Sequence, residues 1–198
     1  MPRNLLSYEE ALVSVHSKLD VLMNTKNTAI VLIDGRAGSG KSRFTGQLAD
    51  LIFRSEKQLP KLIHMDDLYP GWDGLRAGST YLNRSILQPI AAGKQAAWQV
   101  WDWELGRRGT SNEPANGWRS FEGGNLVLAE GCGSVSKESS ELADLTIWIE
   151  SDAGQRKTRF SARDQGQFDS YWAAWSIQED EFYEQEQTIK LCEITVEN

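Results

Sequence analysis

A glycine-rich segment early in the chain has the residue types and spacing of a phosphate-binding loop. Residues 35–42 read Gly-Arg-Ala-Gly-Ser-Gly-Lys-Ser and fit the pattern G-x-x-x-x-G-K-[ST] in full. Glycines let backbone N–H groups approach phosphate oxygens closely, and the N-terminus of a following helix adds attraction. The alternative is a glycine turn that binds nothing. The residues expected to hold a nucleotide are Gly35, Ala37, Gly38, Ser39, Gly40, Lys41, Ser42 and Arg43.

Within this segment two side chains have distinct expected tasks. Lys41 is expected to reach the β- and γ-phosphates of ATP, and the Ser42 hydroxyl is expected to ligate Mg²⁺. Glu130 follows a later apolar run, and a carboxylate at a strand end beside the phosphates suits Mg²⁺, which takes few protein ligands. The sequence therefore predicts ATP and Mg²⁺ as cofactors, with Ser42 and Glu130 at the metal.

Two further carboxylates, Asp66 and Asp67, follow the apolar run at 62–65. The carboxyl ends of strands in a parallel sheet face the ligand crevice, so these side chains are expected near the phosphates. The sequence contains no N-K-x-D run that reads guanine and no transporter-type signature, which favours a small-molecule kinase among P-loop proteins. Such a kinase needs a base that orients the acceptor hydroxyl and takes its proton, and Asp66 is the expected base. The alternative is that both aspartates only cap the next turn.

Three arginines, Arg156, Arg159 and Arg163, are spaced so that they form one row on a helix. Phosphoryl transfer needs cationic stabilisation, so Arg159 and Arg163 are expected to act in catalysis. A solvated basic face is the alternative.

The positions of apolar residues predict the elements that carry these groups. Helical spacing is expected over 7–23 with Ser7 as N-cap, over 42–54, 81–92, 153–162 and 168–185, and a loop over Arg107–Gly124. Short apolar runs at 29–33, 62–65, 126–129, 145–149 and 194–196 predict strands. Strands that alternate with helices indicate a three-layer α/β fold of the P-loop NTPase type, with a mostly parallel five-stranded sheet.

Composition excludes several classes of protein. At 198 residues, one domain over 1–198 is expected, and no apolar stretch is long enough to span a membrane. The net charge of −7 disfavours nucleic-acid binding. Two cysteines are too few for a disulfide framework, and no signal-peptide core precedes residue 10, so a cytoplasmic protein is expected.

From Ile33 onward, the sequence resembles the uridine kinase group of P-loop kinases, which includes phosphoribulokinase and pantothenate kinase relatives. The segment Met65-Asp66-Asp67-Leu68-Tyr69 is similar to the family segment that carries the base. Gly93-Lys94 followed by Val100-Trp101-Asp102-Trp103 resembles the family's acceptor pocket. The alternative for Trp101 and Trp103 is that both face the core from one side of a strand. The row at Arg156 resembles its lid helix, which places a lid at about 153–185.

This resemblance implies a kinase that transfers the γ-phosphoryl group of ATP to a hydroxyl of a small molecule, with a nucleoside such as uridine as the first candidate. The implied acceptor-binding residues are Asp66, Tyr69, Trp101, Asp102 and Arg107. Where the family continues with more arginines, this chain has aromatic residues and an acidic run at 179–181. The tryptophans Trp72, Trp101 and Trp172 indicate an acceptor pocket that is more aromatic than the family's. A kinase for a vitamin precursor or sugar phosphate, or a regulatory ATPase, therefore stays an alternative, and a homo-oligomer is left open.

Overall fold

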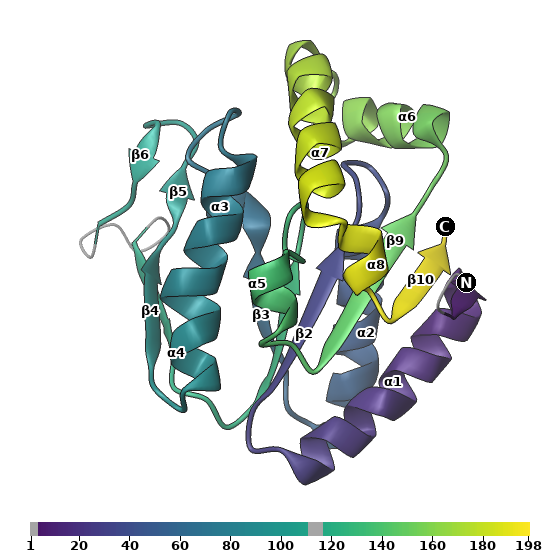
Figure 1. Ribbon diagram of the computed structural model, residues 1–198, viewed down its shortest axis with the longest axis vertical. Coiled ribbons are helices and arrows are strands. Elements are labelled where there is room, and N and C mark those ends of the chain that lie inside the picture. Colours follow the sequence, from purple (N-terminus) through teal and green to yellow (C-terminus); the bar gives the residue numbers. More distant parts are fainter. Residues whose placement is uncertain (1–3, 111–116) are drawn as a thin grey trace.

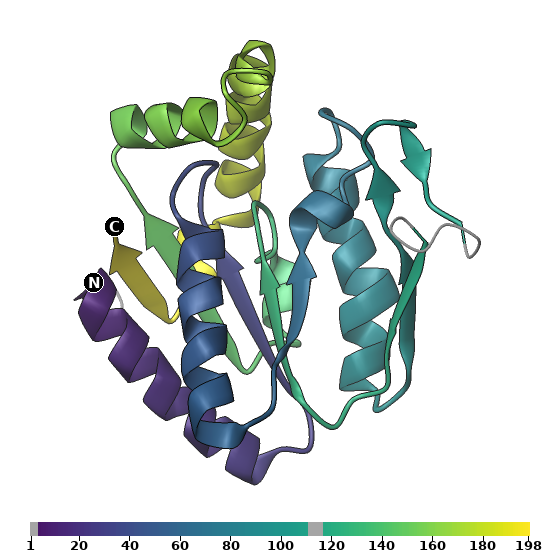
Figure 2. The same ribbon diagram turned by 180° about the vertical axis from the view of Figure 1, so that it is seen from behind.

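The computed structural model describes residues 4–110 and 117–198 and is built on a six-stranded sheet with the order β1-β10-β9-β2-β8-β3. Every pairing in this sheet is parallel. Its strands are β1 (Leu5–Ser7), β2 (Ala29–Asp34), β3 (Lys61–His64), β8 (Leu126–Glu130), β9 (Leu145–Glu150) and β10 (Ile194–Glu197). Helices cover both faces (Figures 1 and 2), which confirms the expected three-layer α/β fold.

The sheet has six strands where five were expected, because Leu5 and Leu6 form an edge strand. Leu5 pairs with Thr195 and Leu6 with Val196 of β10. This strand is too short for an alternating pattern and runs directly into helix α1 (Tyr8–Thr25). Its two leucines also fit the helical spacing of the apolar residues that follow, so the sequence does not predict a strand here. Ser7 is the N-cap of α1, as expected, and its backbone N–H donates to the Glu10 carboxylate at 3.0 Å.

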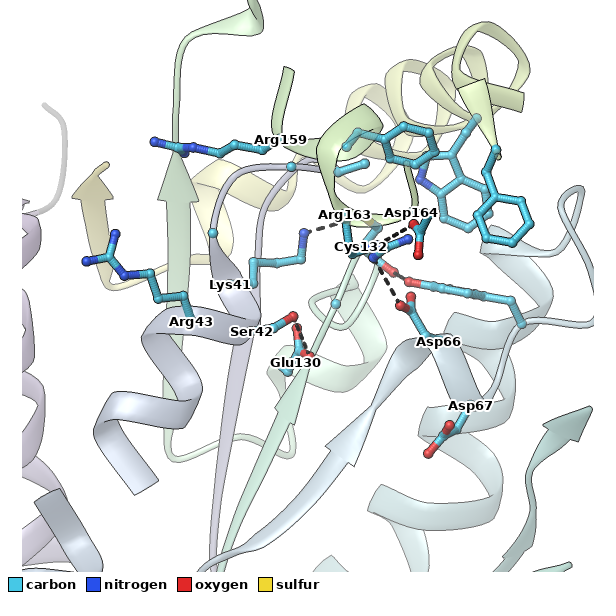
Figure 3. A pocket seen from close by; sticks show the side chains of 18 of the residues that line it. Lys41, Ser42, Arg43, Asp66, Asp67, Glu130, Cys132, Arg159, Arg163 and Asp164 are labelled. Atoms are coloured by element: carbon cyan, nitrogen blue, oxygen red, sulfur yellow. Dashed lines mark hydrogen bonds and ion pairs between the residues drawn. The ribbon is translucent and has the colours of Figure 1, made fainter. Parts of the chain in front are cut away.

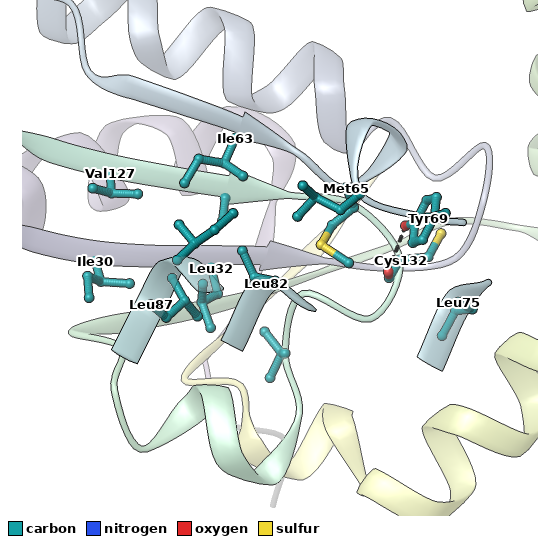
Figure 4. Close-up of a cluster of buried hydrophobic side chains, with 14 of the residues drawn as sticks. Ile30, Leu32, Ile63, Met65, Tyr69, Leu75, Leu82, Leu87, Val127 and Cys132 are labelled. Carbon is teal, nitrogen blue, oxygen red and sulfur yellow. Dashed lines mark hydrogen bonds between the residues drawn. The ribbon is translucent and has the colours of Figure 1, made fainter. Parts of the chain in front are cut away.

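Strand β2 is buried on both faces, and its side chains alternate between two apolar cores. Val31 and Ile33 face the core beneath α1 and α2 (Lys41–Glu56). Ile30 and Leu32 face the opposite core, beneath the helices that follow β3 (Figure 4). Burial on both sides explains the continuous apolar run of β2. Because β2 lies between β9 and β8, the segment that follows β2 begins near the middle of the carboxyl edge of the sheet.

The helical segment expected at 81–92 begins earlier and is not uniform. It consists of α3 (Leu75–Leu82), a π-helical turn (Asn83–Leu87) and α4 (Gln88–Ala91). Gly78 lies in α3 because a Cβ there would come within 2.5 Å of the Tyr69 ring. Small residues that allow close packing interrupt the apolar pattern in the first turns of α3. The predicted start of the helix at residue 81 is therefore later than the observed start at Leu75.

Two small antiparallel pairs flank the main sheet. Strand β4 (Ala96–Gln99) pairs with β7 (Trp118–Phe121), and β5 (Trp101–Asp102) pairs with β6 (Arg107–Arg108). The prediction of a loop over Arg107–Gly124 is therefore wrong at β6 and β7, and its residues 111–116 lie outside the described residues. Strands of two and four residues carry too few positions for a recognisable alternation.

The last part of the chain forms the helices beside the carboxyl edge of the sheet. These are α5 (Lys137–Ser140), α6 (Ala153–Arg163), α7 (Trp172–Glu186) and α8 (Thr188–Leu191), with a 3₁₀ turn at Asp169–Tyr171 before α7. Helices α6 and α7 stand above the carboxyl ends of β2 and β9 in Figure 1. Within the described ranges, no helix combines the length and the apolar character that crossing a membrane requires.

Candidate active site

The glycine-rich segment 35–42, called the P-loop below, connects the end of β2 to the start of α2. Gly38 and Gly40 have φ values of 75° and 97°, which L-residues with a side chain rarely adopt. A cavity of about 670 Å³ opens beside this loop. Six of the eight residues expected to hold the nucleotide line it, whereas Gly35 and Ser39 are buried and are not part of its lining. The lining members are Ala37, Gly38, Gly40, Lys41, Ser42 and Arg43.

The Lys41 ammonium group lies folded against the P-loop itself. It donates to the carbonyl oxygen of Gly35 at 2.7 Å and to that of Arg36 at 3.0 Å. Burial opposes its charge, but nearby carboxylates, including Glu130, raise the pKa of Lys41 above its usual value. The side chain is therefore a permanent cation at the floor of the cavity.

Ser42 and Glu130 meet at the mouth of the P-loop (Figure 3), although 88 residues separate them in the chain. The Ser42 hydroxyl donates to Glu130 Oε1 at 3.0 Å, and His64 Nδ1 lies 2.7 Å from the same oxygen. Burial opposes the charge of Glu130, but the contact with His64 and the charge of Lys41 hold the pKa of this carboxyl below its usual range. Sequence reasoning missed His64, whose only signal was its place at the end of a strand.

This pair of oxygen ligands fits a magnesium ion that is shared with phosphates. The described residues hold no group of three or more histidine, cysteine or acidic side chains that could bind a metal by themselves. Mg²⁺ beside a nucleotide keeps several waters and uses only one or two protein ligands. A buried, ionised carboxylate next to a serine hydroxyl supplies that kind of ligand set.

Asp66 and Asp67 lie on a 3₁₀ turn (Met65–Asp67) that follows β3, and both line the cavity. Asp66 Oδ2 is 3.6 Å from the Arg163 guanidinium of α6. The surrounding walls and the charge of Glu130 raise the pKa of Asp66 above its usual value, and Arg163 opposes this rise. Since 66% of the side chain is open to the cavity, water remains in contact with the carboxylate and limits the effect of the walls.

The arginine side chains of the row on α6 contact different parts of the protein. Arg163 points toward Asp66 in Figure 3 and also pairs with Asp164, with an N–O distance of 2.7 Å. Arg159 lines the cavity but extends to the other side of the P-loop, where it donates to Ser151 and Gln155 at 3.0 Å each. The structure thus brings only Arg163 next to the expected base.

The residues expected to bind the acceptor are only partly gathered at the cavity. Tyr69 lines it, and its hydroxyl donates to the Cys132 carbonyl at 2.7 Å. Trp101, Asp102 and Arg107 lie on the β5–β6 pair and are not part of the cavity lining. Trp103 lines the cavity in their place, and its indole N–H donates to the Asp66 carbonyl at 2.9 Å.

Aromatic side chains form the wall of the cavity opposite the P-loop, which we call the aromatic wall. Trp72 is at its centre, with ring centroids 5.1 Å from Trp103, 5.2 Å from Phe168 and 6.0 Å from Trp175. Tyr171 stacks on Trp72 at 4.5 Å. Of the tryptophans that indicated an aromatic pocket, Trp72 lines the cavity, whereas Trp101 and Trp172 do not. The other rings come from segments that are far apart in the chain, and only the tertiary structure brings them to one wall.

No family model matches this chain, and the comparison with curated proteins found no match. Solved structures are similar in fold. One, described as a possible uridine kinase from Bacillus stearothermophilus, has a TM-score of 0.59 at 20% identity and covers 92% of this chain and 99% of its own. A putative fructose transport system kinase from Silicibacter sp. TM1040 has a TM-score of 0.58 at 14% identity, covering 93% and 98%.

D-glycerate 3-kinase from Cryptococcus neoformans has a TM-score of 0.54 at 14% identity, covering 92% of this chain and 89% of its own. All three proteins carry the name of a kinase, and each alignment spans almost the whole of this chain. At these identities the likeness concerns the fold. The chain therefore has the fold that was expected from its P-loop and from its resemblance to the uridine kinase group.

Proposed function

We propose that this protein is an ATP-dependent kinase that transfers the γ-phosphoryl group to a hydroxyl of a small molecule. The observation that carries this proposal is the arrangement of one cavity. Its floor holds the P-loop with Lys41 and the Ser42–Glu130 pair, and its opposite side holds Asp66 and the aromatic wall. The kinase names of three proteins with this fold support the same reading.

At the P-loop end, the chain binds and orients the triphosphate. Backbone amides of the loop and the N-terminus of α2 attract phosphate oxygens, and Lys41 leaves its carbonyl contacts to bind the β- and γ-phosphates. Ser42 and Glu130 would hold Mg²⁺, while His64 orients the Glu130 carboxylate. When bound, this ion neutralises charge on the phosphate oxygens.

At the other end, Asp66 accepts a hydrogen bond from the acceptor hydroxyl and orients its oxygen toward the γ-phosphorus. A bond forms between that oxygen and phosphorus, the bond to the β-phosphate oxygen breaks, and the hydroxyl proton passes to Asp66. Arg163 lies 3.6 Å from Asp66 and stabilises the negative charge on the phosphoryl oxygens. Arg159 supports the same charge once α6 moves over the phosphates, in a lid at about 153–185.

The charges of the cavity favour an uncharged acceptor with a flat face, and a nucleoside is our first candidate. The cation nearest the acceptor side, Arg163, is already paired with Asp66 and Asp164. A sugar phosphate or an organic acid would bring a negative charge against these carboxylates. A nucleobase could instead stack on exposed rings of the aromatic wall such as Trp103. A cytoplasmic location, where ATP and nucleosides occur together, belongs to this proposal.

The test is a screen of acceptors with Mg·ATP, followed by ³¹P NMR to detect a new phosphate monoester. The panel contains nucleosides, vitamin precursors, sugars and sugar phosphates, and Asp66→Asn is the matched control enzyme. We expect a nucleoside to yield the monoester with the wild type and far less with the control. A product from an anionic acceptor alone would contradict the nucleoside assignment. Inorganic phosphate without any monoester would instead support the regulatory ATPase.

A further inference from the structure

The tip of the P-loop is held from both sides by the two helices that follow β9. The backbone N–H of Ala37 donates to Glu179 Oε1 of α7 at 2.6 Å. The backbone carbonyl of the same residue accepts from the Arg156 guanidinium of α6 at 3.4 Å. Both polar groups of one peptide residue are therefore tied to side chains that lie 119 and 142 positions further along the chain.

Glu179 is completely buried, which is a costly position for a carboxylate. Besides Ala37, its Oε1 atom accepts from the Cys132 thiol at 3.2 Å. Its Oε2 atom has no hydrogen bond and lies 3.7 Å from the Arg36 guanidinium. Each of its polar partners except the thiol belongs to the P-loop. The carboxylate is thus placed to act on the loop, and it does not line the cavity.

Arg156 has a different environment from the other two arginines of its row. It is buried, and its guanidinium lies 5.9 Å from the Trp172 ring of α7. The backbone of Arg156 also touches the loop, because a Cβ on Gly38 would lie 2.2 Å from the Arg156 carbonyl oxygen. Only glycine at position 38 allows this approach. The first turns of α6 therefore pack directly on the tip of the P-loop.

We propose that Glu179 and Arg156 are positioning residues that clamp Ala37 and so couple the shape of the phosphate cradle to the placement of α6 and α7. The proposal rests on the proposed kinase function. With Ala37 fixed at both its N–H and its carbonyl, the following amides of the loop are oriented before the nucleotide arrives. When a nucleotide displaces the loop toward its phosphates, the two contacts of Ala37 transmit this displacement to α6 and α7. These helices carry Arg159, Arg163 and the aromatic residues.

A competing interpretation is that the Glu179 carboxylate imitates a phosphate and must leave before ATP can bind. The two interpretations predict opposite effects on ATP affinity. A clamp that preorganises the loop strengthens binding, so its loss weakens binding. A carboxylate that competes for the site weakens binding, so its loss strengthens binding.

The experiment compares Glu179→Gln, Glu179→Ala and the matched control Asp180→Asn. Glutamine keeps an oxygen that can accept from Ala37, whereas alanine removes it. Asp180 is the next residue of α7; it is 67% exposed and pairs with Arg36 at 2.6 Å, so its substitution removes a charge without touching Ala37. The readouts are the Kd of Mg·ATP by calorimetry, the hydrogen-exchange rate of the Ala37 amide by NMR, and thermal unfolding.

We expect Glu179→Ala to speed exchange at the Ala37 amide and to weaken Mg·ATP binding about tenfold, because a loop that is no longer preorganised must be ordered when the nucleotide binds. Glu179→Gln should keep the protection of this amide and an affinity within about threefold of the wild type. Asp180→Asn should change neither. Measurements at a temperature where every variant is folded separate this effect from a loss of stability.

Tighter ATP binding in both Glu179 variants would overturn the clamp in favour of the competing carboxylate. Wild-type affinity in Glu179→Ala, with a rapidly exchanging Ala37 amide, would overturn the coupling to phosphate binding. A wild-type protein that does not bind Mg·ATP would refute the proposed function itself. That failure is visible in the wild type alone and is thus distinct from a failure of the clamp, which appears only in the variants.

Discussion

The substitution Asp66→Asn tests the assignment of the base most directly, because it keeps the shape of the side chain and removes the proton acceptor. Asp66 also pairs with Arg163, so two effects contribute to the loss. The pair is separated by 3.6 Å, and its side chains are 66% and 56% exposed. An exposed pair of this kind is worth at most about 1 kcal/mol, or roughly a fivefold effect on rate. Loss of a general base costs about 10²- to 10⁴-fold.

The assay is steady-state phosphoryl transfer to the acceptor found in the screen, together with the Kd of Mg·ATP. We expect kcat of Asp66→Asn to fall at least about 100-fold while ATP binding persists. Asp67→Asn is the matched control, because Asp67 lies on the same turn and lines the same cavity. A loss below about fivefold in Asp66→Asn, or a larger loss in Asp67→Asn, would refute the assignment.

The pH dependence supplies a second check on the same residue. The pKa of Asp66 is raised, so the wild-type rate should decline on acidification through a pKa above the usual aspartate value. This acidic limb should be missing from the residual activity of Asp66→Asn. An unchanged acidic limb in that variant would assign the titration to another group.

Three further predictions concern the cradle, the lid and the sheet. Lys41→Ala should weaken Mg·ATP binding or turnover at least about tenfold by calorimetry and kinetics, since it removes a charge-assisted contact; unchanged values would exclude Lys41 from the phosphate site. Binding of ATP should change the tryptophan emission, and comparison with Trp172→Phe gives the part of this change that depends on Trp172. That part should vanish in Arg163→Ala, whereas a full response would leave Arg163 as a solvated charge. Burial raises the pKa of Asp34 to about 6 from 3.8, so the native state binds this proton more readily than the unfolded state. Relative to Asp34→Asn, the wild type should therefore gain up to roughly 3 kcal/mol in its free energy of unfolding as the pH falls from about 6 to about 4. Denaturant titrations of both proteins measure this difference in the free energy of unfolding. A difference that does not change with pH would contradict a buried, titrating Asp34 carboxylate.

Features that depend on neighbouring residues were predictable from the sequence alone. The P-loop is a local motif, since its glycines, its lysine and the adjoining strand and helix are consecutive in the chain. The same holds for Asp66, which follows β3 directly, and for α6, which was expected over 153–162 and extends one residue further, to Arg163. Five of the six strands of the sheet were found because each is an apolar run bounded by polar residues.

Contacts between distant segments were decided only by the tertiary structure. His64 and Glu130 are 66 residues apart and meet because β3 and β8 are parallel neighbours in the sheet. No local pattern shows which strands pair, so neither this contact nor edge strand β1 was predictable. The placement of Trp103, rather than Trp101, in the cavity depends on how the β5–β6 pair packs against the sheet.

The arginine row illustrates the same division within one helix. Its spacing determined that Arg156, Arg159 and Arg163 lie along α6, because helical geometry repeats every 3.6 residues. Spacing does not reveal what each side chain meets. Packing of α6 on the P-loop buries Arg156 against Ala37, whereas the turn after β3 brings Asp66 to Arg163. Periodicity determines a face of a helix, and the surroundings of that face are determined by the rest of the fold.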